Sequence, residues 1–392
     1  MHGLLVISFL FSQVWCTKNA ETPLMSDVCD PRALHPLYVT TDLFETPMEG
    51  LRHQNPLPVF DDYIAFDDAK HLYYLRQEVQ IGDPALAAQF SRVFVSSTGF
   101  IHGFFPHFDA DEAIGKMRNG RNWTPQNKYW GMSDEEIKAG WEKNRDEAAR
   151  AGTRMHELIE WFYEYPDFVT EQHIEYMANA FDMPELLQFL NFHRSEVVPR
   201  GWKPFRTELR AFSRKHNLAG SVDMIYITPE GKLVVVDWKR SKEIKKQNRY
   251  QQGLGPLKHL DDCNFVHYAL QLNLYHWMLI TYLQMPVDSL YLAVFHPNQQ
   301  DYQMIQVPPM QMEIEAMLEQ RFAEEQVKAA DLCMKAVCLL SEAHLKHSAA
   351  MNQPALLAEM VALGQHLVRS QCIAGQKKTI ASQSGQKRRR KA

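Results

Sequence analysis

Two apolar runs near the middle of the sequence carry residues that could do chemistry together. The run "GSVDMIYI" spans residues 220–227 and contains Asp223, and the run "KLVVVDWK" spans residues 232–239 and contains Asp237 and Lys239. Runs this rich in β-branched residues are typical of buried strands, and the "TPEG" between them is a turn signal. The sequence therefore predicts a β-hairpin that presents two carboxylates and an amine.

The register of this hairpin decides whether the two carboxylates meet. With a three-residue loop, Thr228 pairs with Lys232, and the same register sets Asp223 opposite Asp237. Directly opposed side chains lie about 5 Å apart, where two carboxylates repel each other. A divalent cation removes that repulsion, so the pattern predicts a Mg²⁺ site, in which Mn²⁺ can substitute, with Lys239 on the same strand face.

Such a site suits the hydrolysis of a phosphodiester bond. A bound cation lowers the pKa of water and neutralises charge on the phosphate, while Lys239 orients or deprotonates the attacking water or stabilises the pentacoordinate state. The alternative is a surface hairpin on which Asp237 and Lys239 are ordinary solvated charges, because this spacing also recurs by chance.

Three further segments make the hairpin resemble the core of the PD-(D/E)XK nuclease superfamily, in its RecB-like exonuclease branch. "AGTRMHELIE" is similar to that branch's G-T-x-x-H helix, "TELRAF" to the segment that carries its first acidic residue, and "YALQLNLYHWML" to its Q-x-x-x-Y helix. The resemblance covers about residues 90–300 and leaves both ends of the chain unaccounted for. It implies an α/β fold with a restriction-endonuclease-like core, a mixed β-sheet flanked by helices.

The resemblance also implies a function and assigns roles to residues. It implies a Mg²⁺-dependent deoxyribonuclease, an exonuclease that prefers single-stranded DNA, in DNA repair, recombination or replication. The implied catalytic residues are Asp223, Asp237 and Lys239. The implied metal ligands are His156, Glu208, Asp223 and Asp237, and the residues implied to hold the substrate strand are Gln271 and Tyr275.

Each of these residues also has a structural interpretation. Taken alone, His156 is more often a core histidine, Glu208 a paired strand carboxylate, and Glu160 a supporting or surface charge. Gln271 and Tyr275 are one helical turn apart, which fits a core contact as well as a substrate clamp. A catalytically inactive nucleic-acid-binding or scaffold protein of the same fold therefore remains an alternative.

A basic run directly follows the lysine of the hairpin. We predict that its members contact DNA, with Trp238 and Tyr250 as stacking surfaces beside them. These basic residues are Lys242, Lys245, Lys246 and Arg249. A solvated charged face is the alternative interpretation.

Composition limits the kind of partner and cofactor. The net charge is −5, and residues 376–392 hold seven basic residues and no acid, which leaves −12 for the rest. A nucleic acid must therefore bind through a local basic groove and not through bulk charge. The six cysteines lack the spacing of a zinc ribbon or an iron–sulfur cluster, so we expect neither.

The two ends of the chain carry conflicting targeting signals. Residues 1–16 form an apolar leader of signal-peptide length without a preceding basic residue, and they are too short for a membrane span. The tail contains "KRRRK", typical of nuclear import or nucleic-acid contact. We expect a nuclear protein that does not enter a membrane, with the secretory pathway, and hence a secreted nuclease, as the alternative.

The pattern of elements predicts five regions: 1–16 an apolar leader, 17–87 an irregular segment, 88–310 the nuclease core, 311–370 a helical extension and 371–392 a basic tail. The regions outside the core are candidate sites for protein partners.

Within the core, the longest helical pattern begins with a capping box at Ser133 and Glu136. Gly152 interrupts it, which predicts two helices that meet at a kink with Thr153 as the second cap. A further helix is predicted over residues 171–195.

Overall fold

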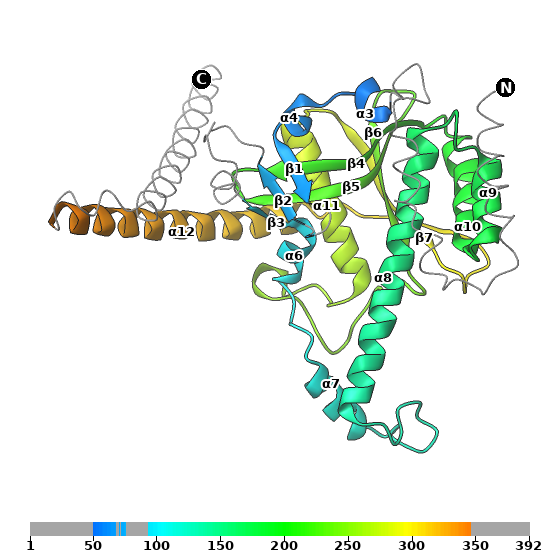
Figure 1. Ribbon diagram of the computed structural model, residues 1–392, viewed down its shortest axis with the longest axis horizontal. Helices are drawn as coiled ribbons and strands as arrows, with labels where there is room; N and C mark the ends of the chain where they lie inside the picture. The colour runs from blue at the N-terminus through cyan, green and yellow to red at the C-terminus, as the bar shows by residue number, and fades with distance from the viewer. Residues whose placement is uncertain (1–49, 68–69, 71, 76–92, 346–392) are drawn as a thin grey trace, which may run out of the picture.

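The computed structural model describes residues 50–67, 70, 72–75 and 93–345 of the chain. One sheet forms the centre, and helices cover it (Figure 1). The leader and the basic tail predicted from the sequence lie outside these residues, as does the part of the predicted helical extension after residue 345. No helix within the described residues is long and apolar enough to cross a membrane.

The sheet has eight strands in the order β1-β2-β3-β5-β6-β7-β8, and β4 pairs with the other side of β5. The pairs β3–β5 and β6–β7 are parallel and the others are antiparallel, so the predicted mixed sheet is confirmed. The strands are β1 (Ile64–Asp67), β2 (Leu72–Leu75), β3 (Val93–Ser96), β4 (Lys203–Ser213), β5 (Leu218–Ile227), β6 (Leu233–Arg240), β7 (Val287–Phe295) and β8 (Gln303–Gln306).

Helices cover both faces of this sheet. Helices α6 and α11 share one hydrophobic core with it, and α8, α9 and α10 share a second. Helix α7 and the start of α8 project from the body as an arm, and α12 extends away from it (Figure 1). The helices are α3 (Leu51–Gln54), α4 (Pro58–Asp61), α6 (Ser97–His102), α7 (Ala110–Arg118), α8 (Asp134–Glu164), α9 (Glu171–Ala180), α10 (Pro184–Phe192), α11 (Asn264–Tyr282) and α12 (Gln311–Leu345).

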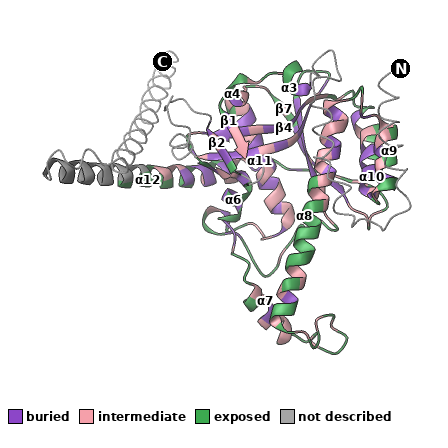
Figure 2. Ribbon diagram, in the orientation of Figure 1, coloured by how far each residue is buried: buried purple, intermediate pink, exposed green. Residues whose placement is uncertain are grey.

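The apolar run of β6 is explained by burial on both faces of the sheet. Leu233 and Val235 belong to the core with α11, whereas Val234 and Val236 belong to the core with α8 to α10. Figure 2 shows buried residues among the central strands and mostly exposed ones along the projecting start of α8. Parallel-paired strands covered on both faces have such continuous apolar runs. Because side chains alternate along a strand, Asp237 continues the α11 face.

The predicted hairpin register is confirmed. The observed pairs run from Ile227 with Leu233 to Met224 with Val236, and the Thr228 N–H donates to the carbonyl of Lys232 at 2.8 Å. The same register, one step further, sets the two aspartates opposite each other.

The predicted division of the long helix into two at Gly152 is wrong. Helix α8 runs without a break for 31 residues through Gly152, and the capping box at its start is confirmed, with Glu136 N–H donating to Ser133 Oγ. Around and after the glycine, the buried Met155 and Ile159 pack in the core with α9 and α10. This tertiary packing outweighs the cost of one glycine, about 1 kcal/mol.

Two other expectations are also corrected. The described residues between 50 and 75, part of the segment predicted to be irregular, include α3, α4, β1 and β2, and the two strands extend the sheet through β3. The single helix predicted over residues 171–195 is divided into α9 and α10. Asp182 has φ +51° at the break, and Pro184 starts the next helix, where its missing N–H costs nothing.

Candidate metal centre

Three acidic residues lie side by side across three neighbouring strands. The β4–β5 register sets Glu208 opposite Asp223, and the β5–β6 register sets Asp223 opposite Asp237. Like charges directly opposite one another destabilise a sheet. A row of three therefore requires compensation by nearby positive charge.

The strands separate where this row lies. Pairing between β5 and β6 ends at Met224 and Val236, and beyond this point β6 pairs with β7 alone, as far as Arg240. The Trp238 N–H, which no longer serves the β5 ladder, donates to Asp223 Oδ2 at 2.9 Å. The split thus makes room for the acidic side chains and fixes one of them.

Helix α8 brings His156 to the acidic row. Its Nδ1 lies 3.9 Å from Glu208 Oε1 and 3.7 Å from Asp223 Oδ2. Its Nε2 lies 3.1 Å from the carbonyl oxygen of Trp238, which can only accept a hydrogen bond, so Nε2 carries the proton. In the neutral ring Nδ1 then faces the two carboxylates with a free lone pair, the arrangement that metal-binding histidines adopt.

The pKa values record the crowding of these groups. Burial alone would lower the pKa of His156, but Asp223 and Glu208 outweigh it and raise this pKa to about 9. Burial and the neighbouring Asp237 raise the pKa of Asp223 to about 7. Burial would raise the pKa of Glu208, yet the hydrogen bond and charge of His156 lower it. One proton on the imidazole thus compensates in part for several carboxylates.

Asp237 pairs with Lys239. The Lys239 Nζ lies 2.6 Å from Asp237 Oδ2, and Asp237 is only 2% exposed. Burial would lower the pKa of Lys239, but Asp237 and Asp223 outweigh it and raise this pKa, which favours the ammonium. Asp237 Oδ1 is buried with no hydrogen-bond partner among the described residues. A buried carboxylate oxygen without a partner is costly unless a cation or water satisfies it.

This donor set fits a divalent cation. One ligand atom each from His156, Glu208 and Asp223 lie within 4.8 Å of one another. The sequence predicted that Asp237 binds the ion together with Asp223, but Asp237 is not one of these three residues. Carboxylate oxygens and an imidazole nitrogen suit Mg²⁺ or Mn²⁺. The unsatisfied Asp237 Oδ1 adds a further oxygen at the same split between strands.

Glu160 lies one helical turn after His156, beside the centre. Burial and the charges of Glu208 and Glu164 raise the pKa of Glu160 to about 8. It lines a cavity together with these two glutamates. Its role as a supporting or a surface charge stays a prediction.

Helix α11 supplies Gln271 and Tyr275. Gln271 is half-buried and its Nε2 donates to Tyr275 Oη at 3.1 Å, whereas Tyr275 is only 2% exposed. A Cβ at Gly220 would lie 2.7 Å from Tyr275 Oη and 2.6 Å from Ser97 Oγ, so only glycine permits this packing. Tyr275 therefore positions Gln271 from within the core.

Two tyrosines beside the centre were not identified from the sequence. The Lys239 Nζ lies 4.8 Å from the ring centroid of Tyr268, a cation–π contact. Tyr268 is three residues before Gln271, so helical spacing could have indicated it. Burial and the charge of Glu208 raise the pKa of Tyr73, on β2, to about 12. Nothing in the sequence around Tyr73 indicated that β2 approaches the centre.

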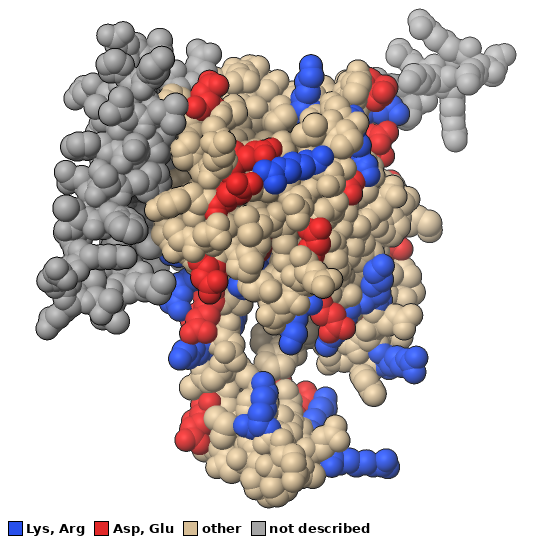
Figure 3. Space-filling model, turned by 90° about the vertical axis from the view of Figure 1, so that its right-hand side faces the viewer, with Lys and Arg blue, Asp and Glu red and all other residues tan. Residues whose placement is uncertain are grey.

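The basic loop after β6 is exposed. Tyr250 is 95% exposed, so it remains a candidate for base stacking, but Trp238 is 2% exposed inside an aromatic core, and its prediction as a stacking surface is wrong. The exposed basic side chains are Lys242, Lys245, Lys246 and Arg249. On the face that Figure 3 shows, basic and acidic side chains are interspersed without a continuous patch of either sign.

A family model described as the PD-(D/E)XK nuclease superfamily matches residues 131–355, more than half of the chain. No curated protein sequence matches. A solved structure of a candidate exonuclease from Eubacterium rectale is similar at 10% identity and a TM-score of 0.33, covering 63% of this chain and 84% of its own. The structure of SSO0001 is similar at 15% identity and a TM-score of 0.21, covering 43% and 69%.

Proposed function

The chain belongs to the PD-(D/E)XK nuclease superfamily, and from this premise we propose that it is a Mg²⁺-dependent deoxyribonuclease. We propose further that it is an exonuclease, that it prefers single-stranded DNA with a free end, and that it acts in DNA repair, recombination or replication. One observation carries the proposal. It is the row of Glu208, Asp223 and Asp237 beside His156 and Lys239, an intact set of ligands and a lysine at one split in the sheet.

The contacts of each residue in the metal centre indicate its role in catalysis. His156, Glu208 and Asp223 would hold the cation, with Asp237 Oδ1 as a further acceptor. A divalent cation bound there supplies a Lewis acid that lowers the pKa of water and neutralises charge on the phosphate. The pairing of Lys239 with Asp237 keeps the lysine an ammonium. An ammonium can orient the attacking water and stabilise the pentacoordinate phosphate, but it cannot take a proton from the water. We therefore favour the first two roles for Lys239.

The substrate strand would approach along the loop that follows β6. Its basic side chains can neutralise phosphates, and the exposed Tyr250 offers a stacking surface. Gln271, fixed by Tyr275, is the residue of α11 that could contact the strand near the scissile phosphate. A nuclear location and protein partners at the flanking regions belong to the same proposal. So do the predicted leader, nuclease core, helical extension and basic tail, without the irregular segment corrected above.

The test is cleavage of end-labelled single strands by purified protein with Mg²⁺. Linear strands should be degraded and circular ones left whole, because an exonuclease requires an end; cleaved circles would show an endonuclease. Asp237→Ala should abolish cleavage. Asp288→Ala, which removes a 45% exposed aspartate paired with Lys232, is the matched control and should keep it. An active Asp237→Ala protein would refute the assignment.

Calorimetric titration with Mn²⁺ separates the nuclease from an inactive scaffold. An intact centre should bind Mn²⁺, and Asp223→Asn should weaken this binding, whereas a decayed centre should show no binding that depends on Asp223. N-terminal sequencing of protein purified from cells tests the secreted alternative, since a secreted nuclease should have lost its leader.

A further inference from the structure

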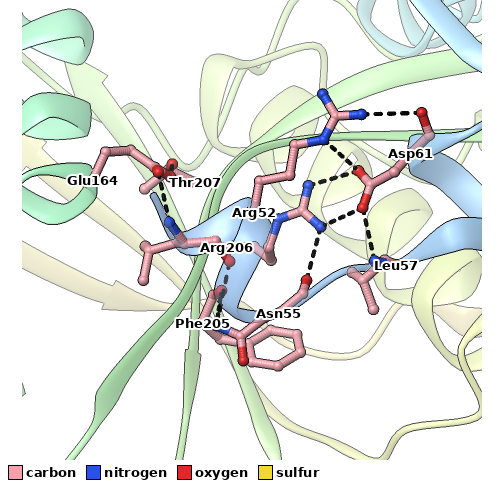
Figure 4. Close-up of polar contacts among 9 residues, drawn as sticks. Arg52, Asn55, Leu57, Asp61, Glu164, Phe205, Arg206 and Thr207 are labelled. Carbon is pink, nitrogen blue, oxygen red and sulfur yellow. Dashed lines mark hydrogen bonds and ion pairs between the residues drawn. The ribbon is translucent and has the colours of Figure 1, made fainter. Parts of the chain in front are cut away.

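Residues 50–61 hold the part of β4 that leads into the metal centre (Figure 4). They contact Phe205 and Arg206 directly. Thr207, the residue before Glu208, is linked to them only through Glu164 of α8, which also accepts the Leu51 N–H. Asn55 Nδ2 donates to the carbonyl of Phe205 at 3.1 Å. This segment lies outside the residues that the family model matches.

A buried ion pair forms the centre of the contact. The guanidinium of Arg206 donates to both carboxylate oxygens of Asp61, at 2.9 and 2.8 Å, and to the carbonyl of Asn55 at 3.2 Å. The side chains of Arg206 and Asp61 are 4% and 12% exposed. Such two-pronged pairs fix geometry as well as charge, because both donors must be aligned at once.

A second carboxylate links the segment to α8 and to β4 together. Glu164 Oε2 accepts the Leu51 N–H at 2.8 Å, and Glu164 Oε1 accepts a hydrogen bond from Thr207 Oγ1. A Cβ at Gly50 would lie 2.2 Å from Glu164 Oε2, so the chain passes directly over this carboxylate. The Thr207 side chain is thus held by its hydrogen bond to Glu164, and both terminal nitrogens of the neighbouring Arg206 are held by Asp61.

Glu208 itself has an unusual backbone. Its φ of +41° lies in the left-handed region that residues with a side chain rarely adopt, and the β4–β5 register shifts between Pro204 and Arg206. Strained residues of this kind persist only where the surrounding structure enforces them. Glu208 also borders a cavity of about 280 Å³ shared with Glu160. Its Oε2 accepts a hydrogen bond from Ser221 Oγ, so β5 holds the carboxylate while its backbone depends on β4.

We propose that residues 50–61, together with Glu164, are a positioning element for the metal centre. By holding Phe205 and Arg206 directly and Thr207 through Glu164, they enforce the backbone of Glu208 and aim its carboxylate at His156 and Asp223. Without this support Glu208 relaxes, and the centre binds its cation more weakly. The inference rests on the proposed function only in taking this centre as the cation site.

The test compares two substitutions of one buried side chain. Thr207→Val removes the hydroxyl that binds Glu164 and keeps the shape, and Thr207→Ser keeps the hydroxyl. In calorimetric titration, Thr207→Val should bind Mn²⁺ about tenfold more weakly than the wild type, the loss typical when a partner that orients a metal ligand is removed. Thr207→Ser should bind Mn²⁺ with nearly the wild-type affinity. Equal affinity of both variants and the wild type would overturn the proposal.

A control from the same strand separates positioning from stability. Ser213, at the other end of β4, is buried and its Oγ lies 2.9 Å from both His216 Nδ1 and Tyr282 Oη. Ser213→Ala should lower the melting temperature and leave Mn²⁺ affinity unchanged. If Ser213→Ala weakens Mn²⁺ binding as much as Thr207→Val does, the loss is general destabilisation and the proposal fails.

A second variant and a double-mutant cycle complete the test. Glu164→Gln removes the charge from the carboxylate that accepts the Thr207 hydrogen bond, and it should lower Mn²⁺ affinity in the same way. It serves as the test if Thr207→Val fails to fold. In a Glu208→Gln background the Thr207→Val effect should vanish, because the ligand being positioned is gone; an undiminished effect would contradict the proposal. If the wild type binds no Mn²⁺ through Asp223, the proposed function fails instead.

Discussion

Asp61, in the segment that contacts β4, and Asp223, in the metal centre, are two half-buried carboxylates with different surroundings. Asp61, 12% exposed, accepts two hydrogen bonds from Arg206 and one from the Leu57 N–H. Burial would raise its pKa, but these donors lower it. Asp223, 10% exposed, accepts one from the Trp238 N–H and faces other carboxylates, and its pKa is raised to about 7.

The difference separates a structural carboxylate from one prepared for a ligand. At Asp61 the protein supplies a full cationic partner, so nothing more is needed. At Asp223 it brings two further carboxylates close and supplies His156 and Lys239 as the nearby positive groups. Protein stability alone would not select such crowding, because an uncompensated buried charge costs several kcal/mol. The missing charge is what a divalent cation would provide.

The largest expected effect is on catalysis. Asp237→Asn should lower the cleavage rate by about a thousandfold or more, because it removes the carboxylate that holds the Lys239 ammonium beside the metal centre. The fold should persist. Single-turnover cleavage and circular dichroism measure the two properties, and a loss of rate that merely tracks unfolding would contradict the assignment.

An aspartate-to-asparagine substitution at Asp61 should lower the stability of the fold and not the catalytic rate alone. Asp61→Asn leaves Arg206 buried without its charged partner, which costs about 3 kcal/mol of unfolding free energy. Chemical denaturation measures it. The exposed pair Arg194–Glu171 is the control, where Glu171→Gln should change stability by less than about 1 kcal/mol. Equal effects of the two substitutions would remove the distinction between the regions.

Without metal, unfolding free energy should fall as the pH rises from 6.5 to 9. The folded protein keeps a proton on His156 up to its pKa of about 9, while the unfolded chain loses it near 6.5, so this contribution is present below 6.5 and lost by 9. The fall should be on the order of 2 kcal/mol. Melting temperatures in a chelator measure it.

Saturating Mg²⁺ is the control for this pH effect. The cation binds the deprotonated ligands, so the decline of stability with pH should flatten or reverse. A decline that is the same with and without Mg²⁺ would mean that other groups cause it.

The smallest expected effect has the opposite sign to that at Asp61. In the absence of metal, Asp223→Asn should stabilise the fold by about 1 kcal/mol at pH 8, because it removes one member of a like-charged row. Its Mn²⁺ binding should be lost at the same time. Thermal denaturation in a chelator checks the sign, and destabilisation would show that Asp223 is a structural carboxylate like Asp61.

Local patterns were enough to predict much of the site. The loop length fixed the register of the hairpin, and the observed pairs from Ile227–Leu233 onward follow it. The capping box at Ser133 placed the start of α8 because it depends on four adjacent residues. The roles of His156 and Glu208 came from resemblance, since neither residue is distinctive alone.

Other features depend on contacts that no local pattern records. The strands β1 and β2 are short and were missed, because their place in the sheet depends on pairing with β3. The aromatic packing that buries Trp238 was missed for the same reason, as was the approach of Tyr73 to Glu208. Continuity of α8 through Gly152 depends on packing against α9 and α10.

The sequence by itself determined which chemical groups are present and, through the period of its strands, that Asp223 and Asp237 face each other. Only the tertiary structure decided which three side chains converge. That convergence brings α8 to the hairpin of β4 and β5, although α8 ends tens of residues before β4 begins, and a segment near residue 50 supports it. Register is a local property of neighbouring residues, whereas a cation site depends on distances between distant ones, which packing alone sets.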